Sequence, residues 1–281
     1  MIGLAIISAL AMAFCIVLAS KVTAWVISKK GALAKSHPLW VTSPFEEKWF
    51  DETTVTVERS GLDFVSLVGI NLTNNEIIRL SGAPGGSSIV AKQKTANDWL
   101  QEGTGVDKPP PGLYFYVAGP LIDPRAGHTV GIVQLPDGRP GLYLKDVFFH
   151  ENAPAGIAGR MLVRMVRTSI DLGIVELALL AAGGRTWPNI VGTERWGGYV
   201  AWPTYGFDMP LEQKTKAVFP HFVHYPHSLS TCYTVREVLA LHGGPVFWKV
   251  VGDGWFMRFD CANENTPAVS ALLSRVRDKG V

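Results

Sequence analysis

A glycine-rich turn carries the clearest chemical signal in this sequence. It reads Gly156-Ile157-Ala158-Gly159-Arg160 and follows an apolar run typical of a strand. Met161, Met165 and Val166 continue it at the spacing of an amphipathic helix. The N–H groups of a helix's first turn lack partners within the helix, and small residues let an anion approach them closely. The turn is therefore a candidate phosphate site, although glycine also serves simply to turn a chain.

Three arginines follow the turn, at Arg160, Arg164 and Arg167. Positions i, i+4 and i+7 share one face of a helix. One interpretation is an ordinary solvated face. The other is that Arg160, which is nearest the helix start, contacts a phosphate.

A second pattern invites a metal interpretation. His221, His224 and His227 recur every third residue, with Cys232 nearby. Prolines within the segment preclude one continuous helix, and spacing alone does not put three ligands on one tetrahedral centre. We therefore expect no metal site there.

The residues around the glycine turn predict alternating strands and helices. Upstream, apolar runs at 113–118, 129–135 and 142–150 predict three strands, the last two forming an antiparallel hairpin. Downstream, a glycine ends the helix and residues 175–181 predict a buried strand. An aromatic segment closing on Tyr205-Gly206-Phe207 follows.

Further segments are readable outside this region. Residues 53–59 alternate and predict a strand, and residues 89–100 predict a short helix. Residues 246–251 and 255–261 flank Gly-Asp-Gly and predict a hairpin. Thr266-Pro267 begins a last amphipathic helix.

With these residues the sequence resembles the GNAT-type N-acetyltransferase superfamily. Members place an R/Q-x-x-G-x-G/A turn between a central strand and a helix; a further strand and a helix ending in aromatic-x-x-x-Gly-Phe follow. Gly156 and Ala158 fall on the G-x-G/A positions, and Gly206-Phe207 on the closing pair. The resemblance extends over about residues 112–211, and upstream by strand order alone.

The resemblance implies acetyl-CoA, or another acyl-CoA, as cosubstrate, and no metal. Backbone amides of two segments would bind it. The first is the central strand from Val147 to His150, in particular Val147 and Phe149, and the second is the turn from Gly156 to Arg160. The base that keeps the amine neutral must lie near the same strand end. The candidates there are His150, Glu151 and Asp146, of which Asp146 has an alternative structural interpretation.

An acid for the departing thiolate is harder to assign. Ala153 stands where the family has Arg or Gln, and Trp202 stands where many members carry the tyrosine that protonates the thiolate. Tyr199 and Tyr205 are the tyrosines near the closing segment, so either is a candidate replacement.

Composition limits the class of protein. The 281 residues are 47% hydrophobic and 18% charged, which is globular rather than disordered. A net charge of +2 gives no reason to expect nucleic acid as a partner. Three widely spaced cysteines fit a reducing compartment better than a disulfide framework.

The N-terminus predicts a membrane anchor. Residues 2–20 carry no charge and are almost wholly apolar, and as a helix they would span about 28 Å, close to the hydrocarbon core of a bilayer. Lys21, Lys29, Lys30 and Lys35 follow the run and no basic residue precedes it, so the positive-inside rule puts the remainder in the cytoplasm. A cleaved secretory signal, which normally has a basic start, and a buried helix are the alternatives.

These observations predict an α/β (α+β) fold with a GNAT-like mixed, mainly antiparallel sheet flanked by helices. The expected divisions are a transmembrane helix at 1–28, a linker at 29–45, an acyltransferase domain at 46–211 and a C-terminal extension at 212–281. The expected function is a single-pass, membrane-anchored N-acyltransferase that moves an acyl group from acyl-CoA to an unidentified amine. Two alternatives stay open: a catalytically inactive GNAT-fold module that binds a ligand or a protein, and a membrane-attached structural protein whose glycine turn is only a turn.

Overall fold

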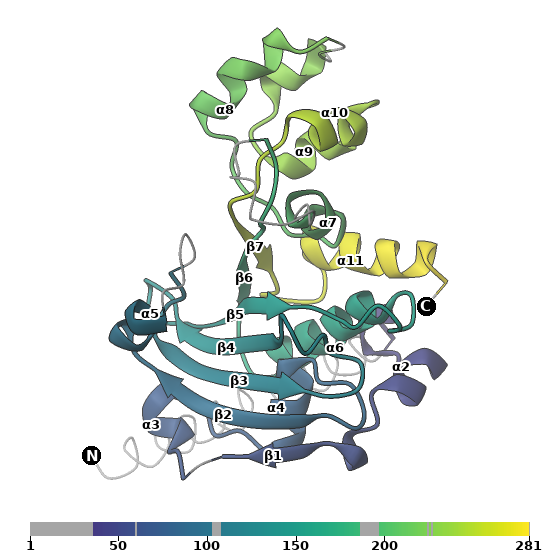
Figure 1. Ribbon diagram of the computed structural model, residues 1–281. Coiled ribbons are helices and arrows are strands. Elements are labelled where there is room, and N and C mark those ends of the chain that lie inside the picture. Colours follow the sequence, from purple (N-terminus) through teal and green to yellow (C-terminus); the bar gives the residue numbers. More distant parts are fainter. Residues whose placement is uncertain are drawn as a thin grey trace, which may run out of the picture. The chain divides into compact units, whose positions relative to one another are not determined.

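The computed structural model describes residues 36–59, 61–102, 108–185, 197–223, 225 and 227–280. The chain divides into two compact units, residues 1–42 and 43–281. The described part of the first unit, residues 36–42, contains a short 3-10 helix, η1 (Pro38–Trp40). All other described elements belong to the second unit (Figure 1).

The expected anchor at 1–28 lies outside the described residues. Within the described part of the chain, no helix is both long enough and apolar enough to cross a bilayer. The second unit begins at Ser43, so α2 (Pro44–Trp49) starts inside the segment expected to be a linker.

One seven-stranded sheet crosses the second unit, with its strands in chain order (Figure 1). The pairs β1–β2 and β5–β6 are parallel, and the other neighbouring pairs are antiparallel. This confirms a mixed, mainly antiparallel sheet flanked by helices. The strands are β1 (Thr56–Glu58), β2 (Ser88–Lys94), β3 (Gly112–Ala118), β4 (His128–Gln134), β5 (Pro140–Val147), β6 (Glu176–Leu180) and β7 (Phe256–Asp260).

Helices cover mainly one face of the sheet. α6 packs against α4 and α11, and α4 also contacts the strands β3 and β4 (Figure 1). The remaining helices connect the strands or belong to the C-terminal extension. Besides η1 and α2, the helices are η2 (Glu52–Thr54), α3 (Phe64–Val68), α4 (Asn74–Ser81), α5 (Ala96–Glu102), α6 (Ile157–Asp171), α7 (Gly198–Thr204), α8 (Gln213–Val218), η3 (Phe219–His221), η4 (His227–Thr231), α9 (Val235–Ala240), α10 (Gly244–Val251) and α11 (Pro267–Asp278).

Side chains alternate between the two faces of the sheet along each strand, and each face packs against its own set of partners. One cross-strand row of buried apolar residues runs from Phe115 through Val130, Leu144 and Leu179 to Met257. On the opposite face, Trp99 of α5 joins Tyr114, Val133 and Tyr143 in a second, smaller core. The sheet is therefore buried on both faces at its centre.

The helix expected at 89–100 is wrong for its first half. Residues Ser88–Lys94 form β2, with Ile89 and Ala91 buried between β1 and β3, and only Ala96–Glu102 is helical. Thr95 separates the two, because its hydroxyl accepts from the Asp98 N–H as a helix cap. Burial between two neighbouring strands therefore favours a strand at residues 88–94 over the helix that the local pattern predicts.

The hairpin expected at 246–261 is also wrong. Residues 246–251 belong to α10, which follows Gly243 in the left-handed region (φ 77°) and buries Phe247, Trp248 and Val251. These positions repeat at helical spacing, which an apolar run this short also allows. Only the second half is a strand, β7, and it pairs with β6. The C-terminal extension therefore supplies a strand of the main sheet.

The elements around the glycine turn follow the expectation. β4 and β5 pair as an antiparallel hairpin, and α6 begins at Ile157 and ends before Gly173, whose φ is 73°. The expected strands at 113–118 and 175–181 appear as β3 and β6, whereas the strand expected at 53–59 is confirmed only for β1 (Thr56–Glu58), because Glu52–Thr54 forms the 3-10 helix η2 with Asp51 as its cap. Thr266 caps α11 as expected, because its hydroxyl accepts from the Val269 N–H.

Candidate functional site

The parallel strands β5 and β6 separate at their carboxyl ends. They pair only from Leu142 to Leu144 of β5, opposite Leu177 to Leu179 of β6, although both strands continue. Lys145 is an extra residue in β5, a bulge in its register with β4. Just after β5 the chain pairs with the β3–β4 connection, through an isolated bridge between Ile122 and Phe149.

This divergence opens the backbone of β5. After Leu144, β5 has no strand partner on its β6 side among the described residues. In Figure 1, β6 and β7 turn away from β3–β5 at this point. Val147, at the end of β5, is opposite His128, while Phe149 packs its ring against that of His128 at 5.9 Å. Open backbone at the carboxyl ends of parallel strands is a common ligand position.

The β5–α6 connection leads directly to the glycine turn. His150 starts it: its carbonyl accepts from the Ala153 N–H at 2.9 Å, and its Nδ1 accepts from the Asn152 N–H at 3.2 Å. Gly156 is the N-cap of α6, with φ 91°, and no side chain caps the helix. Only glycine adopts such a conformation without strain.

The first turn of α6 leaves two amides open. The Ile157 N–H donates to Pro154 O at 3.2 Å, and the Arg160 N–H donates to Gly156 O at 3.1 Å. The N–H groups of Ala158 and Gly159 have no acceptor among the described residues. These amides, at the positive end of the helix dipole, can bind an anion.

Close packing also favours glycine at position 159. A Cβ at this position would lie 3.0 Å from Val276 of α11 and 3.3 Å from the Tyr205 ring. Tyr205 therefore lies beside the glycine turn, with the Arg275 guanidinium 6.0 Å from its ring centre. Tyr199 does not, because its hydroxyl donates to Lys249 O at 2.8 Å. Of the two candidate acids, the structure brings only Tyr205 to the turn.

The candidate bases differ in their surroundings. His150 is half-buried and Glu151 is exposed, both at the start of the β5–α6 connection. Asp146 accepts a hydrogen bond from Lys145 Nζ at 2.6 Å, within the bulge. Asp146 is therefore held in an ion pair with its own neighbour in the strand.

The positions that depart from the family pattern have structural partners. Trp202 packs edge-to-face on Phe207 at 5.3 Å, and Phe207 packs on Phe259 of β7. Ala153 contributes the N–H that closes the His150 turn. Trp202 thus belongs to an aromatic cluster between α7 and β7.

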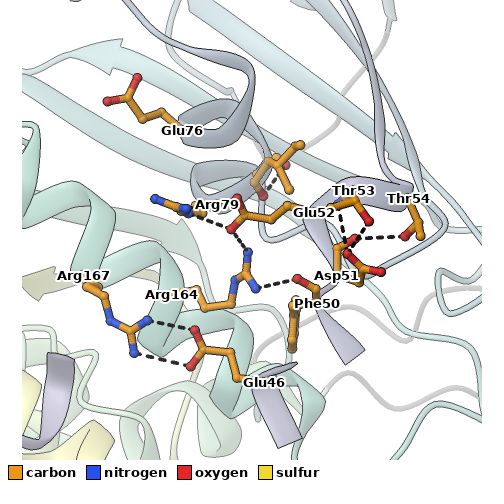
Figure 2. Close-up of polar contacts among 12 residues, drawn as sticks. Glu46, Phe50, Asp51, Glu52, Thr53, Thr54, Glu76, Arg79, Arg164 and Arg167 are labelled. Atoms are coloured by element: carbon orange, nitrogen blue, oxygen red, sulfur yellow. Dashed lines mark hydrogen bonds and ion pairs between the residues drawn. The ribbon is translucent and has the colours of Figure 1, made fainter. Parts of the chain in front are cut away.

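The arginines after the glycine turn do not form a solvated face, which corrects that expectation. Arg167 donates from both Nη atoms to Glu46 of α2, at 2.8 and 3.3 Å (Figure 2). The Glu46 side chain is 4% exposed. Such a two-pronged contact is the strong form of an ion pair.

Arg164 lies deeper, with a side chain 5% exposed. It donates to Phe50 O at 2.9 Å and to Glu52 Oε1 at 2.8 Å, and its guanidinium lies over the Phe50 ring (Figure 2). Arg79 of α4 binds the same Glu52 through Nε and Nη2. Burial lowers the pKa of Arg164, while Glu46 and Glu52 act in the opposite direction.

Arg160 is the arginine nearest the open amides. It is half-buried, in the first turn of α6. Burial lowers the pKa of Arg160, the Glu46 carboxylate opposes this, and Arg167 adds to it. Arg160 is therefore close enough to the Glu46–Arg167 ion pair to be influenced by both charges.

Sequence reasoning missed His128, which is 1% exposed beneath the β5–α6 connection. Its Nε2 lies 2.7 Å from Ser81 O, so it must donate to that carbonyl, and Nδ1 is left without a partner among the described residues. Burial lowers the pKa of His128 to about 4, and the bond to Ser81 only partly opposes this. His128 is therefore neutral at pH 7.

Sequence reasoning also missed the partners of the arginines. Ser43 and Glu46 mark a helix start at α2, since the Ser43 hydroxyl accepts from the Glu46 N–H. Nothing local connects Glu46 with Arg167, which lies 121 residues later.

Within the described residues, no three His, Cys, Asp or Glu side chains gather as a metal site requires; His224 and the His227 side chain lie outside them.

Comparison of the chain with models of protein families, with curated proteins and with solved structures finds no match.

Proposed function

We propose that this chain is a GNAT-like N-acyltransferase that transfers an acetyl or other acyl group from acyl-CoA to an amine. The observation that carries the proposal is the pair of open amides at Ala158 and Gly159, placed after a strand that diverges from its parallel neighbour. A pyrophosphate needs such donors at a helix N-terminus. The thioester would follow the open edge of β5.

The reaction assigns a role to each group. His150 or Glu151 takes a proton from the amine, whose nitrogen then attacks the thioester carbonyl carbon. The amide C–N bond forms as the C–S bond breaks, and the thiolate leaves with the bonding electron pair. Tyr205 gives that thiolate its proton and is itself reprotonated, because the nitrogen releases its second proton as the amide forms. The proposal includes anchoring by the apolar N-terminal segment, with the second unit on the cytoplasmic side.

A second candidate function is favoured by a specific observation. The indole of Trp202 stands where the family's tyrosine would be and is engaged with Phe207, and the Tyr199 hydroxyl is engaged with Lys249. A module that binds acyl-CoA without turnover would have the same open amides. Binding measured apart from turnover separates these two functions.

The direct test is calorimetric titration of acetyl-CoA into the protein and its Ala158→Asp variant. A carboxylate beside the open amides repels the pyrophosphate, so we expect acetyl-CoA affinity to fall by at least about tenfold. Aspartate near a helix start is otherwise favourable, so the free energy of unfolding should hold or rise slightly. Ala240→Asp, the same change at an exposed site, should leave affinity unchanged.

Two results would overturn the proposal. One is a wild-type protein that binds neither acetyl-CoA nor a longer acyl-CoA. The other is Ala158→Asp protein that binds acetyl-CoA as tightly as wild type. Gly156 is a poorer position for this test, because any side chain at φ 91° strains the backbone.

A further inference from the structure

A cavity of about 430 Å³ lies at the amino end of β6. Its lining includes Glu176, the first residue of β6, and Asp260, which ends β7 directly opposite Glu176. The open amides of α6 follow the carboxyl end of β5, and β5 is parallel to β6. The cavity therefore lies at the other end of the strands from those amides, and its volume is that of a small-molecule site.

The Arg236 guanidinium lines this cavity and is incompletely paired. Its Nη2 lies 3.4 Å from Asp208 Oδ2, which is longer than an ordinary hydrogen bond between nitrogen and oxygen. Its Nη1 is buried and has no hydrogen-bond partner among the described residues. A buried donor without a partner costs free energy, so a donor of this kind at the wall of a cavity favours a ligand that accepts from it.

A second guanidinium, that of Arg258, lines the same cavity. It donates from Nη1 to Glu176 Oε2 at 3.4 Å, which is again a long contact. Arg258 and Asp208 exchange backbone N–H···O bonds of 2.8 and 2.9 Å, and the Arg236 N–H donates to Asp208 Oδ1 at 3.0 Å. Asp208 therefore fixes the backbone of both arginines beside the cavity.

The other charged side chains of the lining are more fully engaged. Asp208 Oδ1 accepts from two backbone N–H groups at 2.9 and 3.0 Å, and Asp260 Oδ1 accepts from one at 3.0 Å. Arg139, the third arginine of the lining, binds the aspartate two residues before it through Nε and Nη2. The groups best placed to bind a ligand are thus the donors of Arg236 and Arg258.

The rest of the lining favours a ligand with one negative charge and an apolar body. Three arginines and three acidic residues line the cavity, so Glu176 and Asp208 would repel a second negative charge. A carboxylate carries one charge and matches the two-pronged geometry of a guanidinium. The apolar lining residues are Val175, Met209, Pro210, Ala262 and Ala268.

We propose that this cavity binds a small organic carboxylate with a short apolar body. The carboxylate accepts from Arg236 Nη1 and from the Arg258 guanidinium, and the body packs on Met209 and Ala268. Binding supplies the buried Nη1 with an acceptor that the described residues do not provide. The site is additional to the proposed acyl-CoA site and does not depend on it.

Calorimetric titration of the full-length protein with three probes tests this assignment. 3-Phenylpropanoate carries both features, phenyl phosphate carries a second negative charge, and 2-phenylethylamine reverses the charge. We expect 3-phenylpropanoate to bind tightest. Arg236→Gln should weaken it about tenfold, and Arg236→Lys less, because an ammonium keeps the charge without the planar fork. Arg277→Gln, the same change at an exposed arginine outside the lining, should leave its affinity unchanged.

Arg258→Gln provides a second variant, at a side chain 68% exposed, where a folding defect is not expected. It should weaken 3-phenylpropanoate about threefold. The assignment is overturned if 3-phenylpropanoate does not bind, if phenyl phosphate or 2-phenylethylamine binds as tightly, or if neither Arg236→Gln nor Arg258→Gln weakens it. Ala158→Asp should keep its affinity for 3-phenylpropanoate, and both arginine variants should keep theirs for acetyl-CoA, so the two proposals fail separately.

Discussion

The first turn of α6 differs from the two turns after it in whether its polar groups have partners. In the first turn, Ala158 and Gly159 present N–H groups with no acceptor among the described residues. In the next two turns, Arg164 and Arg167 are bound by Phe50 O, Glu52 and Glu46 (Figure 2). The same helix is thus open at one end and closed along its flank.

The difference separates polar groups that stabilise the fold from polar groups that a ligand can bind. Charged groups buried as deeply as Arg164 must be paired, because an unpaired buried charge costs several kcal/mol. Ala158 is half-buried, so water can reach its amide and no such requirement applies to it, whereas Gly159 is buried. The Ala158 amide can therefore stay without a protein acceptor at little cost in stability, and it is the part of α6 that a ligand can bind.

Breaking the closed flank should have the largest effect. Glu46→Ala removes the carboxylate that Arg167 binds with both Nη atoms, and leaves a largely buried guanidinium without it. We expect the free energy of unfolding to fall by about 3 kcal/mol or more. Urea denaturation monitored by circular dichroism measures it.

The neighbouring glutamate provides the control. Glu47 is exposed on the same helix, so Glu47→Ala should change stability by less than about 0.5 kcal/mol. Replacing Glu46 and Arg167 together by methionine should recover part of the loss, because no buried charge remains. Equal effects of Glu46→Ala and Glu47→Ala would show that the flank is not closed by this pair.

A pH titration sharpens the comparison at His128, whose buried Nδ1 has no partner among the described residues. Its pKa is lowered from an ordinary 6.5 to about 4, so the unfolded chain binds the proton more readily. The stability is fully present above pH 6.5 and is lost as the pH falls toward 4. The loss should reach about 3 kcal/mol.

The measurement compares unfolding free energies of wild type and His128→Gln between pH 7 and 4. The glutamine variant lacks this titration, so its stability should fall less over that interval. Identical pH profiles for the two proteins would contradict a buried, neutral His128.

The smallest effect is expected at the glycine that starts α6. Gly156→Ala places a Cβ at φ 91° and should cost about 1–2 kcal/mol. Gly197 is a matched control, because it is also a helix N-cap without a side-chain cap but has φ −106° and open space around it. Thermal unfolding of both variants isolates the strain, and an equal cost would mean that backbone conformation at Gly156 is unimportant.

Local signals let the sequence determine part of this protein. Turn residues between two apolar runs fixed the β4–β5 hairpin, and helical periodicity bounded by Gly156 and Gly173 fixed α6. The anion-binding interpretation of the first turn also came from local residues. It remains a prediction until acyl-CoA binding is measured.

Only the tertiary structure decided the rest. Whether residues 88–94 formed strand or helix depended on burial between two other strands, and 246–251 became helical by packing Trp248 inward. The choice of Tyr205 over Tyr199, and of Glu46 as the partner of Arg167, came from segments far apart in the chain. Contacts of this kind depend on which faces the sheet brings together, and that information is absent from any local window of sequence.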